Sequence, residues 1–279
     1  MTRLAFSTLG CPGAPLDHVL KLAQSNNIVG LELRTADDEF THTGLTAAER
    51  RALRARIDDA GLEILAINSY VKLCAVEEQP LEAHLQLAAD LGARGVRVFP
   101  GDEPGTATSP ASGDSLPTSE APGDSPTAGE IRALDRVTTA PREVAILLET
   151  HDSHSSGRKM AVLCGLLDAE VPRHNAKVIW DSAHTWSQGE TPAESFDLLK
   201  PWIDFVQIKD EDSAKDYKPV PIGAGDYPID QLLQAVQGTE YWLSLEWELK
   251  WHPHLPPLDE ALPATWNWIS AAEEEVIHR

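Results

Sequence analysis

The strongest constraint on the fold is a regular alternation of short apolar runs with stretches of helical periodicity. Eight apolar runs are predicted strands, at residues 4–7, 29–33, 63–68, 95–99, 144–148, 177–180, 205–208 and 242–245. A candidate helix follows seven of them, and an irregular segment follows the fourth. Eight strands in such an alternation favour an α/β fold of the (β/α)₈ TIM barrel type over an open, doubly wound sheet. The 279 residues suit one barrel domain, since such barrels typically have about 250 residues.

The predicted helices have apolar residues at helical spacing. They cover residues 19–23, 47–60, 81–91, 159–167, 193–198, 230–236 and 259–274. Gly61 and Gly92 follow two of these stretches, and glycine is a common residue just after the last helical turn. We therefore expect the second and third helices to end at these glycines.

One segment, residues 101–129, breaks the alternation. It is crowded with Pro, Gly, Ser, Thr and acidic residues, contains no Lys or Arg, and has Leu116 as its one large hydrophobic residue. Such a composition buries too little apolar surface to offset the entropy of ordering. We expect a flexible insertion after the fourth strand, within a single domain of residues 1–279. It is interpreted either as a lid over the barrel or as a tolerated disordered insertion.

Acidic residues outnumber basic ones by 44 to 23, which gives a formal net charge of −21. Nucleic-acid binding depends on Lys and Arg that neutralise phosphates, so we expect no nucleic-acid partner. No apolar run approaches the ~18 residues that span a bilayer, and the first residues lack a signal-peptide pattern, so we expect a soluble cytoplasmic protein without a membrane partner. Cys11, Cys74 and Cys164 lack CxxC spacing and are expected to be reduced packing residues.

Metal-capable side chains stand where four predicted strands of the second half end. These residues are Glu149, Asp181, Gln207 and Glu246. The carboxyl ends of barrel strands converge, and alternation along a strand puts Glu149 on the same face as Leu147. A polar group above an inward apolar stack is costly unless it is paired or binds a cation. Three carboxylates and an amide oxygen are hard ligands, and we expect them to hold one divalent ion, Mg²⁺ or Mn²⁺.

At this point the chain resembles the xylose-isomerase-like (β/α)₈ sugar isomerases and epimerases over nearly its full length, apart from residues 101–129. The resemblance is carried by Gly30–Arg34, Gly95–Phe99, Glu149–His151, Asp181–His184, Val206–Asp210, Gly223–Asp226 and Glu246. It implies metal ligands Glu, Asp, His and Glu, at Glu149, Asp181, Gln207 and Glu246. Gln207 departs from the pattern, because it stands where the family has a His. This departure weakens the case for a transition metal and leaves a degenerate, metal-free site open.

The resemblance also implies a mechanism. A metal that holds a carbonyl and the adjacent hydroxyl oxygen of a sugar stabilises the enediolate formed when the α-proton leaves. Glu149 and Glu246 are the expected acid and base, on opposite sides of the mouth. His184 is expected to bind substrate hydroxyls or to support the ligands. Lys209 is interpreted either as a group that stabilises the enolate or as a surface lysine.

Several residues nearby are weaker candidates. His151 and His154 follow Glu149 closely enough to line the mouth, or they belong to a solvated loop. Trp186 and Trp251, in predicted loops, are candidates for stacking on a sugar face.

Three further charged residues stand at predicted strand ends. Glu32 and Arg34 end the second strand, where a salt bridge between them is favoured over binding of a substrate oxygen by Arg34. Glu248, in phase with Glu246, is a second-tier candidate.

The expected function is a metal-dependent isomerase or epimerase of a small-molecule carbohydrate or hydroxy-keto acid. An inosose-type dehydratase on the same scaffold and a non-catalytic carbohydrate-binding barrel remain alternatives. An abasic-site endonuclease is disfavoured by the acidic charge. The sequence carries no signal for the oligomeric state.

Overall fold

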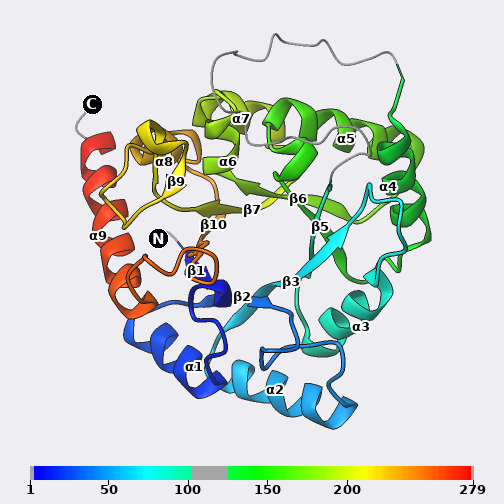
Figure 1. Ribbon diagram of the computed structural model, residues 1–279, viewed down its shortest axis with the longest axis horizontal. Coiled ribbons are helices and arrows are strands. Elements are labelled where there is room, and N and C mark those ends of the chain that lie inside the picture. Colours follow the sequence, from blue (N-terminus) through cyan, green and yellow to red (C-terminus); the bar gives the residue numbers. More distant parts are fainter. Residues whose placement is uncertain (1–2, 102–124, 278–279) are drawn as a thin grey trace.

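The computed structural model describes residues 3–101 and 125–277. Eight parallel strands close into a barrel in the order β1-β10-β7-β6-β5-β4-β3-β2, with the helices outside it (Figure 1). The strands are β1 (Arg3–Ser7), β2 (Gly30–Arg34), β3 (Glu63–Lys72), β4 (Gly95–Phe99), β5 (Ala145–Glu149), β6 (Ala176–Asp181), β7 (Ile203–Ile208) and β10 (Trp242–Leu245). The predicted (β/α)₈ barrel is therefore confirmed.

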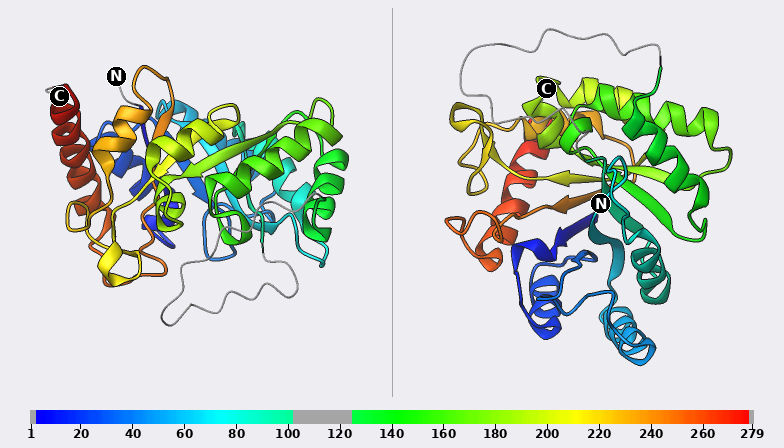
Figure 2. Two further views of the ribbon diagram at one scale, coloured as in Figure 1. Left: turned by 90° about the horizontal axis from the view of Figure 1, so that it is seen from above. Right: turned by 45° about the vertical axis from the view of Figure 1, so that its right-hand side comes forward.

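The helices surround the strands, as the further views in Figure 2 also show. They are α1 (Leu16–Ser25), α2 (Ala47–Asp59), α3 (Leu81–Leu91), α4 (Ala128–Thr139), α5 (Gly157–Glu170), α6 (Ser182–Ser187), α7 (Pro192–Leu199), α8 (Ile229–Ala235) and α9 (Leu258–Ile277). Seven of them match predicted helices, whereas α4 and α6 lie where the sequence patterns gave no range. Within the described residues, no helix combines the length and the apolar character that crossing a membrane requires.

Local sequence signals explain where several helices begin and end. Thr46, Thr127 and Thr191 each form a capping box with a Glu three residues later, at the start of α2, α4 and α7. Gly92 ends α3 with a φ of 69°, a conformation that glycine adopts without steric cost. The expected helix end at this glycine is confirmed.

Most of the predicted insertion at 101–129 falls on residues 102–124, which lie outside the described residues. Its last part is described and is partly helical, because α4 begins at Ala128. The expected insertion therefore overlaps α4 by two residues, Ala128 and Gly129, and the rest of it stays a prediction. The physical reason for this overlap is the capping box of Thr127 and Glu130, which starts a helix inside a stretch whose composition alone is typical of a loop.

The inside of the barrel is a packed core with a polar layer above it. The apolar members of this inner cluster are Ala5, Leu65, Ala66, Ala145, Leu147, Ile179, Phe205 and Trp242. Gly30 and Gly95 leave room for it, since a Cβ at either position would come within 2.6 Å of Trp242 or Leu147. Leu147 lies beneath Glu149 and Phe205 beneath Gln207, as alternation along the strands predicts. The barrel therefore presents its polar side chains at the carboxyl ends of the strands.

Candidate active site

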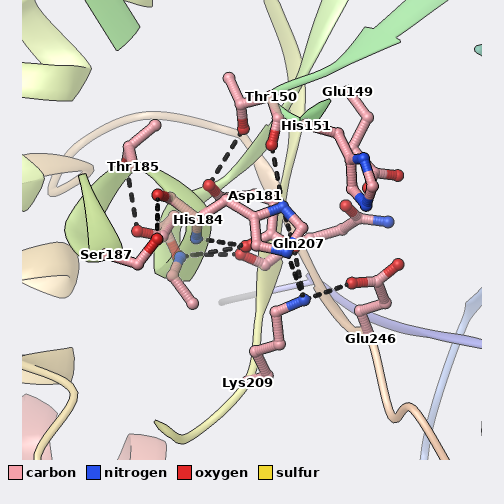
Figure 3. A network of polar contacts seen from close by, with 12 residues as sticks. Glu149, Thr150, His151, Asp181, His184, Thr185, Ser187, Gln207, Lys209 and Glu246 are labelled. Carbon is pink, nitrogen blue, oxygen red and sulfur yellow. Dashed lines mark hydrogen bonds and ion pairs between the residues drawn. The ribbon is translucent and has the colours of Figure 1, made fainter. Parts of the chain in front are cut away.

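The four predicted ligands converge at the mouth of the barrel. Glu149 and Asp181 are the last residues of β5 and β6, Gln207 lies in β7, and Glu246 directly follows β10. Oxygen atoms of Glu149, Asp181 and Glu246 all lie within 4.8 Å of one another (Figure 3). Each of the four residues is at most 4% exposed. The structure thus brings together the residues that the sequence placed at separate strand ends.

The short helix α6 fixes the Asp181 carboxylate. Its Oδ1 accepts hydrogen bonds of 3.0 Å from the backbone N–H groups of Ala183 and His184, as an N-cap of the helix. Only Oδ2 is left to face the centre of the barrel mouth. The helix α6 was not predicted, although an Asp directly before Ser-Ala-His is a recognisable N-cap signal.

Arg97, on β4, links two of the acids. Its Nη1 lies 3.1 Å from Glu149 Oε2 and 3.5 Å from Glu246 Oε1, and its Nη2 donates to the Ser69 carbonyl. The side chain is only 4% exposed. Glu149 and Glu246 therefore share one guanidinium. In the barrel order, β6 and β7 separate their two strands, and their expected positions on opposite sides of a bound substrate stay a prediction. The sequence analysis did not single out Arg97 as a site residue, although a charged residue inside an apolar strand run is a usable signal.

Lys209 lies at the centre of the site and 1% of its side chain is exposed, so its interpretation as a surface lysine was wrong. Its Nζ is 2.8 Å from Asp181 Oδ2, 2.7 Å from Glu246 Oε2 and 2.6 Å from Glu248 Oε1. Burial alone lowers the pKa of Lys209, but the charges of these acids outweigh it and raise the pKa well above the usual range. Lys209 is therefore a fixed positive charge at the mouth.

His184 is held in one tautomer. Its Nδ1 lies 2.9 Å from the carbonyl oxygen of Thr150, which accepts, so Nδ1 carries the hydrogen. Its Nε2 lies 3.2 Å from Lys209 Nζ and accepts from it. Burial and the Lys209 charge lower the pKa of His184 to about 3, so the ring is neutral at physiological pH.

His151 lies next to this network. Its ring is 4.9 Å from that of His184, edge to face, and 4.3 Å from that of Phe99. Atoms of Glu149, His151 and His184 form a second group within 4.8 Å that is capable of holding a metal ion. Asp152 Oδ1 lies 2.7 Å from His151 Nδ1, which leaves Nε2 as the free ring nitrogen.

The buried acids of the mouth hold their protons more tightly than usual. Burial is the main cause, and it raises the pKa of Glu149 to about 8, against the opposing charge of Arg97. Burial likewise raises the pKa of Glu246, with Lys209 opposing it. A cation that binds here would displace protons and compensate the clustered negative charge.

Several ligand-type oxygens have no hydrogen-bond donor among the described residues. Glu149 Oε1 and Gln207 Oε1 are buried and unpartnered. Asp181 Oδ2 has the Lys209 ammonium at 2.8 Å as an ion pair, but it too accepts no hydrogen bond of good geometry. Buried acceptors without donors are rare in folded proteins, and oxygens of this kind are what a hard cation would use. The donor set therefore fits Mg²⁺ or Mn²⁺.

Glu32 forms the floor of the site. Its Oε2 accepts from Gln207 Nε2 at 2.9 Å and from Asn68 Nδ2 at 3.0 Å, and its Oε1 accepts from the Ser244 hydroxyl. Burial raises the pKa of Glu32 to about 7, while the hydrogen bonds from Ser244 and Asn68 act in the opposite direction.

The expected salt bridge between Glu32 and Arg34 was wrong. Arg34 instead pairs with Glu39 and, at 3.1 Å, with Asp38, and its Nε donates to the Tyr70 hydroxyl at 2.8 Å. The reason is position, because Arg34 ends β2 and reaches the acids of the following loop, whereas Glu32 is one pleat deeper and meets residues across the barrel.

The remaining candidates lie around the mouth. His154 is buried and its Nε2 lies 3.5 Å from Glu130 Oε1 in α4. The Trp186 ring packs edge to face on Tyr217, at 4.9 Å. Trp251 is 54% exposed in the segment after β10.

A pocket of about 450 Å³ opens beside Lys209 and its partners. It is lined in part by His184, Glu211, Tyr217, Lys218, Glu248 and His252. The hairpin of β8 (Glu211–Asp212) and β9 (Lys218–Pro219), which the sequence did not predict, supplies one wall. Glu211 is 3% exposed, burial raises its pKa to about 8, and its Oε2 has no hydrogen-bond partner among the described residues.

The protein is a closed parallel barrel with acids at the carboxyl ends of its strands. Enzymes of the (β/α)₈ barrel class have their active sites at this face. The profile of the family described as xylose isomerase-like TIM barrel matches residues 20–271. The chain belongs to this family, which confirms the resemblance seen in the sequence. Members of the family include isomerases, epimerases and a dehydratase.

Three relatives illustrate the range. A 3-dehydroshikimate dehydratase of Bacillus anthracis is 32% identical over 125 residues, which cover 39% of this chain and 44% of that protein, so less than half of its length is matched. The structure of an L-ribulose 3-epimerase has a TM-score of 0.72 at 15% identity, over 100% of this chain and 96% of the other. IolI, solved with a bound zinc atom, has a TM-score of 0.69 at 16% identity, over 99% and 98% of the two chains. At such identities the two structures support the fold alone.

Proposed function

We propose that the protein is a divalent-metal-dependent isomerase or epimerase of a small sugar, sugar derivative or hydroxy-keto acid. The observation that carries the proposal is the convergence of Glu149, Asp181 and Glu246 within 4.8 Å, beside the unpartnered Gln207 Oε1. These four residues would hold the ion, with Mg²⁺ or Mn²⁺ preferred because all the donors are oxygens. The bound zinc atom of IolI supports a divalent ion in this kind of barrel.

When bound, the ion would supply Lewis-acid polarisation of a substrate carbonyl and its neighbouring hydroxyl. Glu149 and Glu246 would transfer the proton. Burial raises the pKa of both groups in the metal-free site, to about 8 for Glu149, so each holds a proton more readily than an exposed Glu does. Arg97 contacts both carboxylates and would keep them oriented as protonation changes. Removal of the proton by one carboxyl and delivery by the other to the opposite face of the same carbon would yield epimerisation. Delivery of the removed proton by the same carboxyl to the neighbouring carbon, with the hydroxyl proton moving to the former carbonyl oxygen, would yield aldose–ketose isomerisation.

Lys209 and His184 would bind the substrate on the side of the pocket. The Lys209 ammonium, which lies 2.7 Å from Glu246 Oε2, would stabilise negative charge that develops on a substrate oxygen. The neutral His184 lines the pocket, as do Glu211 and Glu248, whose carboxyl groups suit the hydroxyl groups of a carbohydrate. The pocket volume of about 450 Å³ is in the range of small-molecule sites.

A direct test is to incubate the protein with Mn²⁺ and a panel of ketoses and keto sugars in D₂O. NMR then measures the rate at which substrate C–H protons exchange for deuterium. The wild-type protein is expected to exchange the proton next to the carbonyl, and E149Q and E246Q to lose at least 100-fold in rate. Undiminished exchange in both variants would exclude these two residues as the acid and base.

A dehydratase is the second candidate, and the Bacillus anthracis relative favours it. Such an enzyme would use the same proton abstraction and then lose a β-hydroxyl group. Mass spectrometry of the product distinguishes the two functions, because dehydration lowers the mass by one water and epimerisation leaves it unchanged.

A further inference from the structure

We infer that Glu32 is a positioning residue, which holds the Gln207 amide with its oxygen toward the proposed metal site. The inference rests on the proposed function, because it concerns how one ligand of the proposed ion is oriented. It adds a residue of β2, on a part of the barrel that supplies none of the four proposed ligands.

The hydrogen bonds determine which end of the amide faces which way. Gln207 Nε2 lies 2.9 Å from Glu32 Oε2. Both oxygens of Glu32 already accept, Oε2 from Asn68 and Oε1 from Ser244, so the carboxylate offers the amide no hydrogen and the amide nitrogen must be at this end. The oxygen Oε1 is then at the other end of the amide. It is buried and has no donor among the described residues. In Figure 3 the Gln207 side chain lies among Glu149, Asp181 and Glu246.

Glu32 is itself held in place from other strands. Asn68 of β3 donates to Oε2 at 3.0 Å, and Ser244 of β10 donates to Oε1. Ser244 is the Cα partner of Gln207 in the sheet, so the donor and the amide lie at the same level. Glu32 is 0% exposed, so its carboxylate has no contact with solvent. In the barrel order, β1 and β10 separate β2 from β7, so the contact crosses the barrel interior.

The orientation decides whether residue 207 is a ligand. An amide oxygen has lone pairs for a hard cation, whereas the NH₂ group has two hydrogens and none to offer. Without an acceptor at Glu32, the amide is free to turn its NH₂ group toward the acids of the site. Glu32 would thus act on metal binding through Gln207, as outer partners of metal ligands commonly do.

The test is a mutant cycle of Mn²⁺ affinity, measured by calorimetry on the full chain at about pH 8. E32M removes the acceptor, and we expect 10–100-fold weaker Mn²⁺ binding, the usual loss for such a partner. E32Q is the matched control, because its carbonyl oxygen still accepts from Gln207 while its NH₂ group donates to Ser244. We expect E32Q to stay within about threefold of the wild type. In a Q207A background, E32M should cause no further loss.

Each result supports or overturns the inference. Equal losses from E32M with and without Gln207 would overturn it, since Glu32 would then act through its charge or through folding. Should thermal melting show that E32M does not fold, E32D serves instead, because it keeps the charge but withdraws the carboxylate by one methylene. E32D should weaken Mn²⁺ binding when Gln207 is present and should have no effect in the Q207A background. An E32D variant that binds Mn²⁺ as tightly as the wild type would overturn the inference. If the wild-type protein binds no Mn²⁺, the proposed function fails first, and the inference with it.

Discussion

The Lys209 ammonium is buried against the Glu246 carboxylate, with Nζ 2.7 Å from Oε2. The same nitrogen lies 2.8 Å from Asp181 Oδ2. A divalent ion bound to these two oxygens would therefore have a positive neighbour at close range. Glu248, 2.6 Å from Nζ and outside the proposed ligand set, offers the ammonium another partner.

Replacement of Lys209 by methionine should strengthen metal binding, because it removes the competing charge. We expect K209M to bind Mn²⁺ at least tenfold more tightly, because tenfold corresponds to about 1.4 kcal/mol, well below the about 4 kcal/mol by which unit charges near 4 Å interact at an effective dielectric constant of 20. Turnover should fall sharply. Calorimetry with Mn²⁺ measures the affinity, and K215M, at a lysine 68% exposed, is the control that should change nothing. Weaker Mn²⁺ binding by K209M would contradict the competition.

Removal of the Arg97 side chain should destabilise the protein strongly. R97M leaves Glu149 and Glu246 buried without their shared guanidinium, and breaking a buried ion pair typically costs about 3–5 kcal/mol. The free energy of unfolding from urea denaturation should fall by that amount. R54M removes a pair with Asp58 in which both side chains are about half exposed, and it should cost less than about 1 kcal/mol. Equal effects of the two substitutions would show that Arg97 is not a structural link.

Stability without metal should decrease as the pH rises from 6.5 to 8. Burial raises the pKa of Glu32 to about 7 and of Glu149 and Glu211 to about 8, from an ordinary value of 4.5. The folded state therefore binds more protons than the unfolded state in this range, and the free energy of unfolding falls with rising pH. The lowered pKa of His184 has the opposite effect, but only below about pH 6.5.

In EDTA, we expect denaturant titrations to show a loss of roughly 1–3 kcal/mol over this range. E211Q should flatten the slope, because it removes one of the three acids. Mn²⁺ should also flatten it, since the ion favours ionised ligands. A free energy of unfolding that rises between pH 6.5 and 8 would contradict the assignment of these buried acids.

Replacement of Gln207 by histidine should change which metal the site prefers. An imidazole nitrogen suits Zn²⁺ and Co²⁺ better than an amide oxygen does, and Glu32 is placed to accept the other ring N–H. We expect the affinity for Zn²⁺ relative to Mn²⁺ to rise about tenfold or more in Q207H. Competition titrations with a chromogenic chelator measure the ratio. An unchanged ratio would argue that residue 207 does not contact the ion.

The sequence predicted the parts of this site that follow from strand periodicity. Two positions were predicted correctly, with Glu149 above Leu147 and Gln207 above Phe205. These predictions needed only two rules, that side chains alternate along a strand and that barrel strands end at one face. The convergence of Asp181 and Glu246 with Glu149 followed from the same rule.

Contacts that cross the barrel could not be read from periodicity. The partner of Glu32 is Gln207, 175 residues away, rather than the nearby Arg34. Lys209 is buried because three acids from the ends of two strands, β6 and β10, surround it, and no local pattern distinguishes it from a surface lysine. Arg97 differs, because its position inside an apolar strand run was a usable local signal, whereas its two acidic partners were not predictable from that run.

The most direct test of the proposed metal site is a Mn²⁺ titration of the EDTA-treated protein, followed by calorimetry and electron paramagnetic resonance. We expect one Mn²⁺ per chain. D181N should weaken binding at least tenfold while it keeps the cap of α6, because Asn caps helices as well as Asp does. Absence of Mn²⁺ binding, or equal binding by D181N and the wild type, would contradict the account.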